Sequence, residues 1–270
     1  MDYSKYEDRH LSIEVEDKVA LATLNRPETL NAIGDGLHEA MEDFLTEVGV
    51  SEEINAVVLT GAGRGFSSGG DVKSIANFAE GTTPEPRSPM DLLRSPKHLI
   101  QKFLNCEVPI IAAVNGVAAG LGATLALMSD VIFASDRARI GDTHVRAGLV
   151  AGDGGAVIWP YLIGPHRAKE LLMSGRLLNA DEASKIGLVN RVVPADQLLH
   201  EAMEFAHELA NGPTLAIRLT KMTINRHLWT SLNTSLEFGL LAEQITFGSQ
   251  DSKEAASAFM EKRDPKFTGR

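Results

Sequence analysis

Residues 109–130, PIIAAVNGVAAGLGATLALMSD, form the stretch that decides the fold predicted for this chain. The stretch begins with a short uncharged run, 110–114, that is typical of a β-strand. An Asn-Gly pair at 115–116 ends this run, and the apolar segment 123–128, which follows Gly120, has the composition of a buried helix. A strand, a glycine turn and a buried helix direct free backbone N–H groups at whatever lies above the start of the helix. Taken alone, the stretch is more simply an ordinary β–α corner of a parallel sheet.

A second glycine-rich turn lies upstream and gives the first one a possible function. The apolar run AVVLT at 56–60 is typical of a strand covered on both faces, and it leads into GAGRGFSSGGD at 61–71. If the two turns face one point, their N–H groups form an oxyanion hole for an acyl or enolate oxygen. The plainer alternative is a pair of tight turns. Neither turn carries the Lys-Ser/Thr signature of a P-loop, so neither indicates a nucleotide phosphate.

The composition is that of a soluble globular protein and argues against several classes of function. The chain has 270 residues, enough for one large domain or one domain with an appendage. Its formal net charge of −10 argues against nucleic acid as a partner. It has no apolar run long enough to span a bilayer and no signal-peptide core, so we expect no membrane partner. The single cysteine, Cys106, excludes an internal disulfide and fits a cytoplasmic location.

Strands and helices alternate along the first two thirds of the chain. Apolar patterning predicts strands at 11–16, 19–24, 131–134 and 188–193, and helices at 30–48, 92–105, 167–174 and 180–186. The proline-rich segment 82–96 is expected to form a surface loop. From residue 195 onward the pattern is helical. This order predicts an α/β protein with a core at 1–195 and a C-terminal helical region at 196–270.

Motifs spread in order over nearly the whole chain resemble those of the crotonase (enoyl-CoA hydratase/isomerase) superfamily. They are LNRP at 24–27 with LNA at 30–32, GFSSGGD at 65–71, AVNG at 113–116 with Gly120, GDGG at 152–155, LLMSG at 171–175 and FMEKR at 259–263. The resemblance implies a crotonase-type spiral of ββα units with a C-terminal helical trimerisation region, assembled as a homotrimer or a dimer of trimers. It also implies an acyl-CoA thioester substrate, with coenzyme A as part of the substrate and no separate cofactor.

The resemblance assigns binding roles to the residues at matching positions. The enolate oxygen would be held by the backbone N–H groups of Ser68 and Leu121. Coenzyme A and the acyl group would be bordered by a larger set of residues. This set is Arg26, Pro27, Glu28 and Thr29 near the adenosine moiety, Gly69, Gly70, Asp71, Val72 and Thr124 around the glycine turns, and Phe259 and Lys262 in a tail that often contacts coenzyme A from a neighbouring subunit.

The catalytic residues depart from the family pattern. Typical hydratases place two glutamates on opposite sides of the acyl group, and the matching positions here are Thr124 and His144. Neither side chain is a carboxylate, so water cannot be added by the two-glutamate route.

His144 is therefore the candidate base. A histidine oriented by an aspartate can take a proton from water near neutral pH, because its unperturbed pKa is about 6.5. Asp153, in a glycine-flanked turn, is the expected partner, whereas Asp142, only two residues before the histidine, is expected to point elsewhere. The alternative is that His144 is a structural, hydrogen-bonded histidine. The chain shows no metal-ligand spacing, so we expect no metal.

The His144 segment also resembles the β-diketone hydrolase branch of the family, the oxocamphor hydrolase type, which cleaves a C–C bond by a retro-Claisen step. Glu243 matches a third acidic position of that branch, but the other histidines of the branch have no counterpart here. The sequence thus predicts an enzyme that acts on an acyl-CoA, with His144 and Asp153 activating water for hydration or for C–C hydrolysis. The alternatives are a β-diketone hydrolase that does not use coenzyme A, and an acyl-CoA-binding family member without catalysis.

Overall fold

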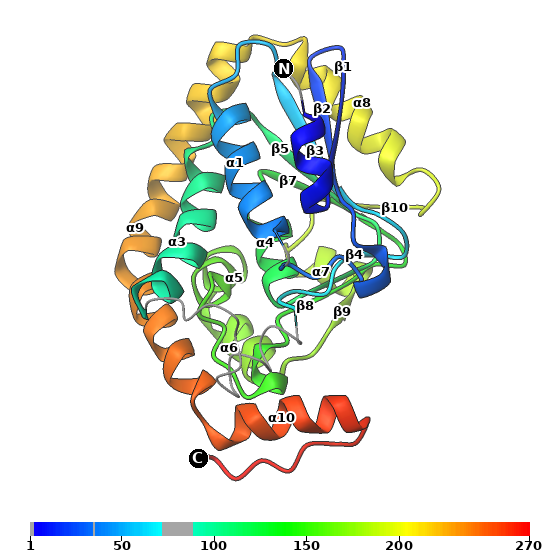
Figure 1. Ribbon diagram of the computed structural model, residues 1–270. Coiled ribbons are helices and arrows are strands. Elements are labelled where there is room, and N and C mark those ends of the chain that lie inside the picture. Colours follow the sequence, from blue (N-terminus) through cyan, green and yellow to red (C-terminus); the bar gives the residue numbers. More distant parts are fainter. Residues whose placement is uncertain (1–2, 35, 72–88) are drawn as a thin grey trace.

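The computed structural model describes residues 3–34, 36–71 and 89–270 (Figure 1). Val72 and residues 82–88 of the predicted proline-rich loop lie outside these ranges. The rest of that segment is not a loop, because helix α3 already begins at Pro89 rather than at residue 92. Proline is accepted at the first helical position, where the backbone N–H has no helical acceptor in any case.

The helices follow the predicted order with one clear difference at the first of them. They are α1 Leu37–Gly49, α3 Pro89–Asn105, α4 Leu121–Met128, α5 Gly155–Ile163, α6 Pro165–Ser174, α7 Ala180–Lys185, α8 Leu198–Ala210, α9 Thr214–Phe247 and α10 Gln250–Glu261, with short 3-10 helices η1 Ser4–Arg9, η2 Pro27–Thr29 and η3 His144–Ala147. The prediction of a helix from residue 30 is wrong, because Leu30 and Asn31 both have a φ of 56°. This left-handed conformation cannot continue a right-handed helix.

Two sheets form the centre of the molecule. The larger sheet has the strand order β1-β2-β3-β5-β7-β10, in which β1 and β2 are antiparallel and the other neighbours are parallel. Its strands are β1 Leu11–Glu16, β2 Val19–Leu24, β3 Ala56–Gly61, β5 Ile110–Val114, β7 Val131–Ser135 and β10 Arg191–Val193. The smaller sheet has the order β4-β6-β8-β9, with β9 antiparallel to β8. Its strands are β4 Gly65–Ser67, β6 Val117–Ala119, β8 Arg139–Gly141 and β9 Leu178–Asn179.

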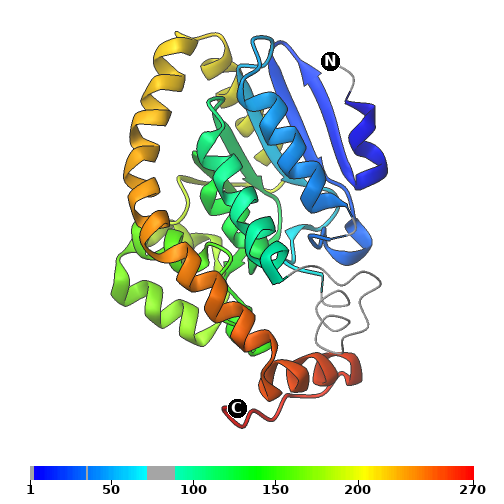
Figure 2. The same ribbon diagram turned by 60° about the vertical axis from the view of Figure 1, so that its left-hand side comes forward.

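Helices cover both faces of the larger sheet (Figures 1 and 2). On one face, Val57 and Leu59 of β3 join a core cluster with residues of α1 and α3. On the other face, Ala56 and Val58 join a cluster with residues of α8. Successive side chains of a strand point to opposite faces. A strand covered on both sides is therefore apolar throughout, as the sequence of β3 is.

The two sheets are built from a repeated unit. A strand of the smaller sheet directly follows each of three strands of the larger one, so that β4 follows β3, β6 follows β5 and β8 follows β7. Helix α4 completes the second of these units. This is the predicted spiral of ββα units, and the predicted α/β fold is confirmed. Because β4 and β6 are neighbours in the smaller sheet, the turns that follow them lie close together.

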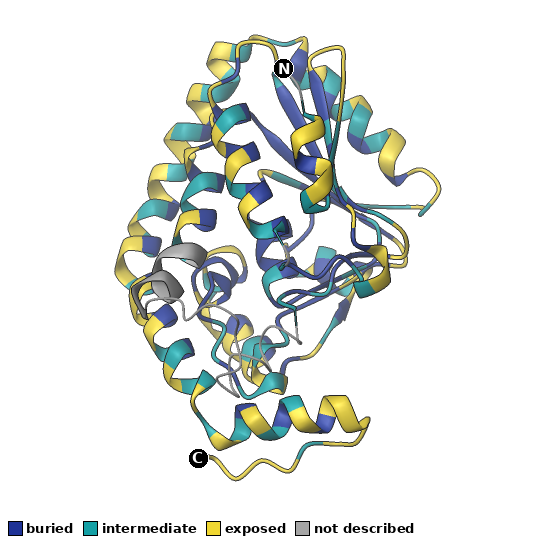
Figure 3. Cartoon of the chain, in the orientation of Figure 1, coloured by how far each residue is buried: buried dark blue, intermediate teal, exposed yellow. Residues whose placement is uncertain are grey.

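The last part of the chain is helical, as predicted. Helix α8 packs on the larger sheet, whereas α9 runs the length of the molecule and α10 lies across one end of it (Figures 1 and 2). Much of the outer surface of α9 and α10 is exposed (Figure 3). No helix in the described part of the chain has both the length and the apolarity that a membrane crossing needs.

Candidate active site

The two glycine turns meet at the start of α4. Gly69 has a φ of +94°, and a Cβ on this residue would lie 2.7 Å from the Ala119 carbonyl oxygen and 3.3 Å from the Leu121 nitrogen. A Cβ on Gly122 would lie 2.5 Å from the Ser67 carbonyl oxygen. Contacts this short leave no room for a side chain, so both positions require glycine. The backbone that follows β4 therefore lies directly against the first turn of α4.

Leu121 presents a free donor at this meeting point. It is the first residue of α4, and N–H groups in the first turn of a helix have no helical acceptor. The Leu121 N–H makes no hydrogen bond within the described residues. It is thus available to a ligand, and its role in an oxyanion hole stays a prediction.

The second predicted donor, the Ser68 N–H, is not available. It donates to the Leu30 carbonyl oxygen at 2.9 Å and is part of the framework of the loop. Gly70, two residues later, has an N–H without an acceptor among the described residues. The N–H groups on either side of Gly70 also have partners: Gly69 donates to Ser67 Oγ and Asp71 to the Ile33 carbonyl oxygen, both at 3.2 Å. The prediction for Ser68 is therefore wrong, and Gly70 is the open donor of this loop.

A β-bridge explains why Gly70 remains open. Gly70 pairs with Ile33 in a parallel bridge whose hydrogen bonds are made by the residues that flank Gly70. The N–H of Gly70 itself therefore faces away from Ile33. The sequence marks Gly70 as a binding residue but gives no sign of this pairing.

Arg26, one of the residues predicted near the adenosine moiety, is bound to the end of the glycine turn at 61–71. Arg26 is buried, and its Nη1 donates to Asp71 Oδ2 at 3.2 Å and to the Ala32 carbonyl oxygen at 3.0 Å. Beside this ion pair, Pro27 and Glu28 of η2 are exposed. Arg26 and Asp71 thus hold each other, while η2 presents surface that a ligand can contact.

His144 lies next to the start of α4 and between two aspartates. A Cβ on Gly120 would lie 3.4 Å from the His144 Cε1, which places the imidazole against the turn that leads into α4. The ring Nδ1 is 2.8 Å from Asp142 Oδ1, and Nε2 is 3.2 Å from Asp153 Oδ2. The predicted contact of His144 with Asp153 is present. The prediction that Asp142 points elsewhere is wrong, because the turn into η3 brings its carboxylate back to the ring and to the His144 N–H at 3.1 Å.

Glu243 reaches the same cluster from α9. Its Oε1 lies 4.0 Å from His144 Nε2. The approach depends on two glycines, since a Cβ on Gly152 would overlap the Gly239 carbonyl oxygen and lie 2.8 Å from the Glu243 Cβ. Backbone therefore packs directly on backbone, and this contact brings the carboxyl group of a C-terminal helix to the turn that carries Asp153.

The protonation of the cluster follows from its burial and its charges. Burial alone would lower the pKa of His144, but attraction to Asp153 and Asp142 and hydrogen bonds to both outweigh it, so the pKa lies well above 6.5. Burial, followed by repulsion from Asp153, raises the pKa of Glu243 to about 8. At neutral pH the ring is an imidazolium and Glu243 is a neutral acid. The ring geometry leads to the same state, because each nitrogen needs an N–H to face a carboxylate oxygen.

Thr124 stands where a hydratase would have a glutamate. It is fully buried, its Oγ1 donates to the Gly120 carbonyl oxygen at 3.4 Å, and its Cγ2 would be 2.9 Å from a Cβ on Gly154. Thr124 therefore fills the space between α4 and the turn that carries Asp153. It offers no group for proton transfer.

The cluster also has the spacing of a cation site. One ligand atom from each of Asp142, His144 and Asp153 lies within 4.8 Å of the others. Both ring nitrogens already face carboxylate oxygens, however, and a ligating nitrogen must have lost its proton. To bind at Nε2, a metal ion would have to displace the proton on that nitrogen and break the contact with Asp153. This cost disfavours metal binding at the cluster. The expectation that no metal is bound stays a prediction.

Phe259 and Lys262, predicted to contact coenzyme A, lie near the end of α10 and are exposed. The start of this helix packs against the residue that ends η3, since a Cβ on Gly148 would lie 2.8 Å from the Ser252 nitrogen. Phe259 and Lys262 thus lie on the helix that contacts the His144 segment, but the structure does not bring them into the cluster itself.

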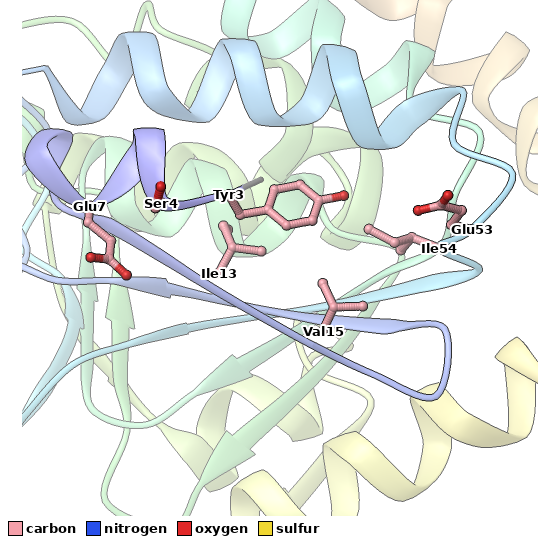
Figure 4. A pocket seen from close by; sticks show the side chains of 7 residues that line it. All are labelled: Tyr3, Ser4, Glu7, Ile13, Val15, Glu53 and Ile54. Carbon is pink, nitrogen blue, oxygen red and sulfur yellow. The ribbon is translucent and has the colours of Figure 1, made fainter. Parts of the chain in front are cut away.

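A separate pocket of about 350 Å³ lies between η1 and β1 (Figure 4). Tyr3, Ile13 and Ile54 line its apolar part, while Glu7 and Glu53 lie at its two ends. None of its lining residues belongs to the glycine turns or to the His144 cluster. It therefore has no part in the chemistry of that cluster.

The ββα spiral is the fold of the crotonase class of proteins. A model of the enoyl-CoA hydratase/isomerase family matches residues 14–270, and the chain belongs to this family. It is 36% identical over 256 residues to a 1,2-epoxyphenylacetyl-CoA isomerase of Escherichia coli, covering 95% of this chain and 97% of that protein. It is 37% identical over 252 residues to a short-chain-enoyl-CoA hydratase of Clostridium acetobutylicum, covering 93% and 94%.

Solved structures of the family have the same fold. The chain matches the crystal structure of an enoyl-CoA hydratase/isomerase from Mycobacterium paratuberculosis with a TM-score of 0.85 and 32% identity, covering 92% of this chain and 98% of that one. It matches one from Pseudoalteromonas atlantica with a TM-score of 0.85 and 30% identity, covering 96% and 100%.

Proposed function

We propose that this protein adds water to an enoyl-CoA thioester, with His144 and Asp153 as its acid–base pair. The observation that carries the proposal is the position of the His144 ring, which lies against Gly120 with Nε2 on Asp153 at 3.2 Å. The acid–base pair is thus beside the turn whose next residue, Leu121, offers a free N–H. Family membership supports the acyl-CoA thioester as the substrate class.

The oxyanion hole in this proposal consists of the Gly70 and Leu121 N–H groups. Both belong to the glycine turns that meet at the start of α4, and neither has another acceptor among the described residues. Two preorganised donors at this point stabilise the negative charge that develops on the thioester oxygen when the enolate forms.

The roles of His144 and Asp153 follow from the protonation of the cluster. An imidazolium cannot take a proton from water, so Asp153 is the base and His144 the acid. The water oxygen bonds to the β-carbon, its proton passes to Asp153, and the C=C electron pair moves into the enolate. The enolate then collapses, and its α-carbon takes the Nε2 proton of His144. Asp153 returns its proton to Nε2 across the 3.2 Å contact, which restores both groups.

Hydrolytic C–C cleavage of a β-keto acyl group is a second candidate, favoured by Glu243. A neutral carboxyl group 4.0 Å from His144 Nε2 can donate a hydrogen bond to a second carbonyl oxygen of the substrate. Water activated by Asp153 would attack that carbonyl carbon, the C–C bond would break, and the departing enolate would take the His144 proton. The two proton transfers are the same as in hydration, and only the carbon that water attacks differs.

Coenzyme A enters both reactions as part of the substrate, and no separate cofactor or metal is needed. The pair of N–H donors replaces a Lewis acid at the thioester oxygen, and Asp153 replaces a metal-bound hydroxide. We therefore expect turnover to be unchanged by chelators.

Turnover assays with several substrates test the proposal. Wild type, His144→Ala and Asp153→Asn are assayed on crotonyl-CoA, on a β-keto acyl-CoA and on a free cyclic β-diketone, with and without a chelator. We expect turnover of at least one CoA thioester and a loss of about 100-fold or more in both variants. His200→Ala is the matched control, because His200 is an exposed residue of α8, and it should retain full activity.

Each other result assigns a different function. Turnover that survives His144→Ala would remove the assigned acid. Turnover of the β-diketone alone would favour a hydrolase that does not use coenzyme A. Tight binding of CoA thioesters without turnover of any substrate would favour the non-catalytic binding protein.

A further inference from the structure

Asp142 holds His144 through two hydrogen bonds to a single oxygen. Its Oδ1 accepts from the His144 backbone N–H at 3.1 Å and faces ring Nδ1 at 2.8 Å. One bond fixes the backbone at the start of η3 and the other fixes the ring relative to that backbone. Two anchors on the same atom leave the imidazole one orientation, in which Nε2 faces Asp153.

The second oxygen of Asp142 shows how the carboxylate itself is held. Asp142 is 1% exposed, and its Oδ2 is buried without a hydrogen-bond partner. A Cβ on Gly155 would overlap this oxygen, so Oδ2 packs directly against the backbone of that residue. Gly155 is the first residue of α5, a helix of nine residues. The partial positive charge at a helix N-terminus attracts a negatively charged oxygen placed beside it.

The two aspartates are therefore not equivalent. Asp142 is locked between η3 and α5, and its contact with the ring is 0.4 Å shorter than that of Asp153, at 2.8 Å against 3.2 Å. Each aspartate has one oxygen without a hydrogen-bond partner, but that of Asp142 packs on the backbone of Gly155, whereas Asp153 lies in the glycine-flanked turn. Asp153 is thus suited to exchange a proton and Asp142 to keep one in place.

We propose that Asp142 is a positioning residue, which holds the His144 ring so that the Nδ1 proton stays bound and only the Nε2 proton is exchanged with substrate. This role rests on the proposed function of His144 as the acid. Without Asp142 the ring is free to turn toward Asp153 and Glu243, and either nitrogen can then carry the proton that faces the acyl group.

Two substitutions separate positioning from charge. In Asp142→Asn the amide oxygen can still accept both bonds from His144, because the same atom accepts both in the wild type. The orientation is kept, but a negative charge beside the ring is lost. In Asp142→Ala both anchors are lost. The measurements are kcat and KM over a range of pH, and nitrogen NMR of the His144 ring in the full-length protein.

We expect the Ala variant to lose about 100-fold in kcat with little change in KM, since the thioester binds at the glycine turns rather than at Asp142. The Asn variant should recover most of that loss, and its activity should begin to fall at a lower pH than that of wild type. At a pH above the pKa of the ring, where the imidazole is neutral, the NMR spectrum should show the remaining proton on Nδ1 of His144 in wild type and in Asp142→Asn, but exchange between the two tautomers in Asp142→Ala.

Equal activity of the three proteins, or the same ring protonation in all of them, would overturn the proposal. If Asp142→Ala does not fold, the Asn variant decides: a kcat near that of wild type with the Nδ1 proton retained is the result of a positioning role, whereas a loss of about 100-fold in kcat with the ring still in place would assign Asp142 an electrostatic role and overturn the proposal. Absence of turnover in wild type would contradict the proposed function alone, and the NMR measurement would still test Asp142.

Discussion

The ring of His144 lies between two carboxylates, and this decides the direction in which it can transfer a proton. Its contacts with Asp142 and Asp153 need an N–H at each end, so the resting ring is a proton donor. A histidine with a single carboxylate partner keeps one nitrogen free and acts as a base. In the proposed function, histidine at a glutamate position of the family thus retains acid–base chemistry, and Asp153 takes the first proton.

The pH dependence of kcat/KM tests this assignment. The pKa of His144 lies well above 6.5, so its acidic form is fully present below that raised pKa and is lost as the pH rises through it. Glu243 is neutral until the pH reaches about 8. We therefore expect kcat/KM to stay constant from about pH 6 to neutrality and to decline above pH 8.

Glu243→Gln is the matched control for this profile. The amide keeps the neutral form of the side chain, so the part of the decline near pH 8 that belongs to Glu243 should disappear, while the His144 part remains. A profile that instead rises through about pH 6.5 would identify His144 as a base with an ordinary pKa and contradict the assignment.

Motif positions predict which residues gather at the site but not how they are hydrogen-bonded. His144, Asp153 and Glu243 match family positions, and the structure places carboxylate oxygens of Asp153 and Glu243 at 3.2 Å and 4.0 Å from His144 Nε2. Ser68 and Asp142 are assigned incorrectly from the sequence. The free N–H of Gly70 depends on the β-bridge with Ile33, and the direction of the Asp142 carboxylate depends on the turn into η3. The side-chain pattern of the sequence indicates neither feature.

At the scale of elements, glycines bring the groups of the proposed active site together. Gly69 and Gly122 let the β4 loop contact α4, and Gly152 with Gly239 lets α9 contact the Asp153 turn. In each pair a backbone carbonyl occupies the volume that a Cβ would need. The position of each group in the proposed active site therefore depends on close backbone packing as much as on its own side chain.

Gly152→Ala tests the contact between α9 and the Asp153 turn. The added methyl group would overlap the Gly239 carbonyl oxygen, so the two segments must move apart. Overpacking of this kind costs about 2–3 kcal/mol in the free energy of unfolding, which corresponds to a melting temperature lower by roughly 5–10 °C. Activity should fall as well, because Glu243 and Asp153 move relative to His144. Thermal melting and the turnover assay measure the two effects.

Gly248→Ala, at the C-terminal end of α9, is the control for Gly152→Ala. Gly248 is exposed, its φ is −78°, and its added Cβ would meet only the Ile245 carbonyl oxygen at 3.5 Å. The change should alter stability by less than about 0.5 kcal/mol. Equal melting temperatures for the two variants would show that the Gly152 contact is not tight.

Elements are predicted well where side-chain patterns decide them and poorly where the backbone does. The strands at 11–16 and 19–24 are found with their predicted bounds. The apolar residues of the second are mostly buried, whereas in the first only Leu11 is buried and Val15 is exposed. The helix predicted from residue 30 begins only at Leu37, since positive φ at residues 30 and 31 interrupts it. The last strand spans Arg191–Val193 and is shorter than the predicted run from residue 188.

At the scale of the whole molecule, the outer face of α9 is unusually apolar. Phe238, Leu241 and Ile245 are 74%, 51% and 69% exposed, and their spacing of three and four residues places them on one side of the helix. Phe259 on α10 is also exposed. Exposed apolar faces of this size mark interaction surfaces. They support the prediction that the C-terminal helices carry the contacts of a homotrimer or a dimer of trimers.

Light scattering after size-exclusion chromatography tests this assembly. We expect the wild type to elute at three or six times its chain mass of 29.1 kDa, and a variant with Phe238→Asp and Ile245→Asp to dissociate, because each change would bury a charge in an apolar contact. Val50→Asp is the control, since Val50 is 70% exposed but lies beyond the end of α1. If Phe259 and Lys262 contact coenzyme A across the interface, the dissociated variant should also have a raised KM for CoA thioesters. A wild type that stays at 29.1 kDa while fully active would show that one chain is sufficient and would contradict the predicted assembly.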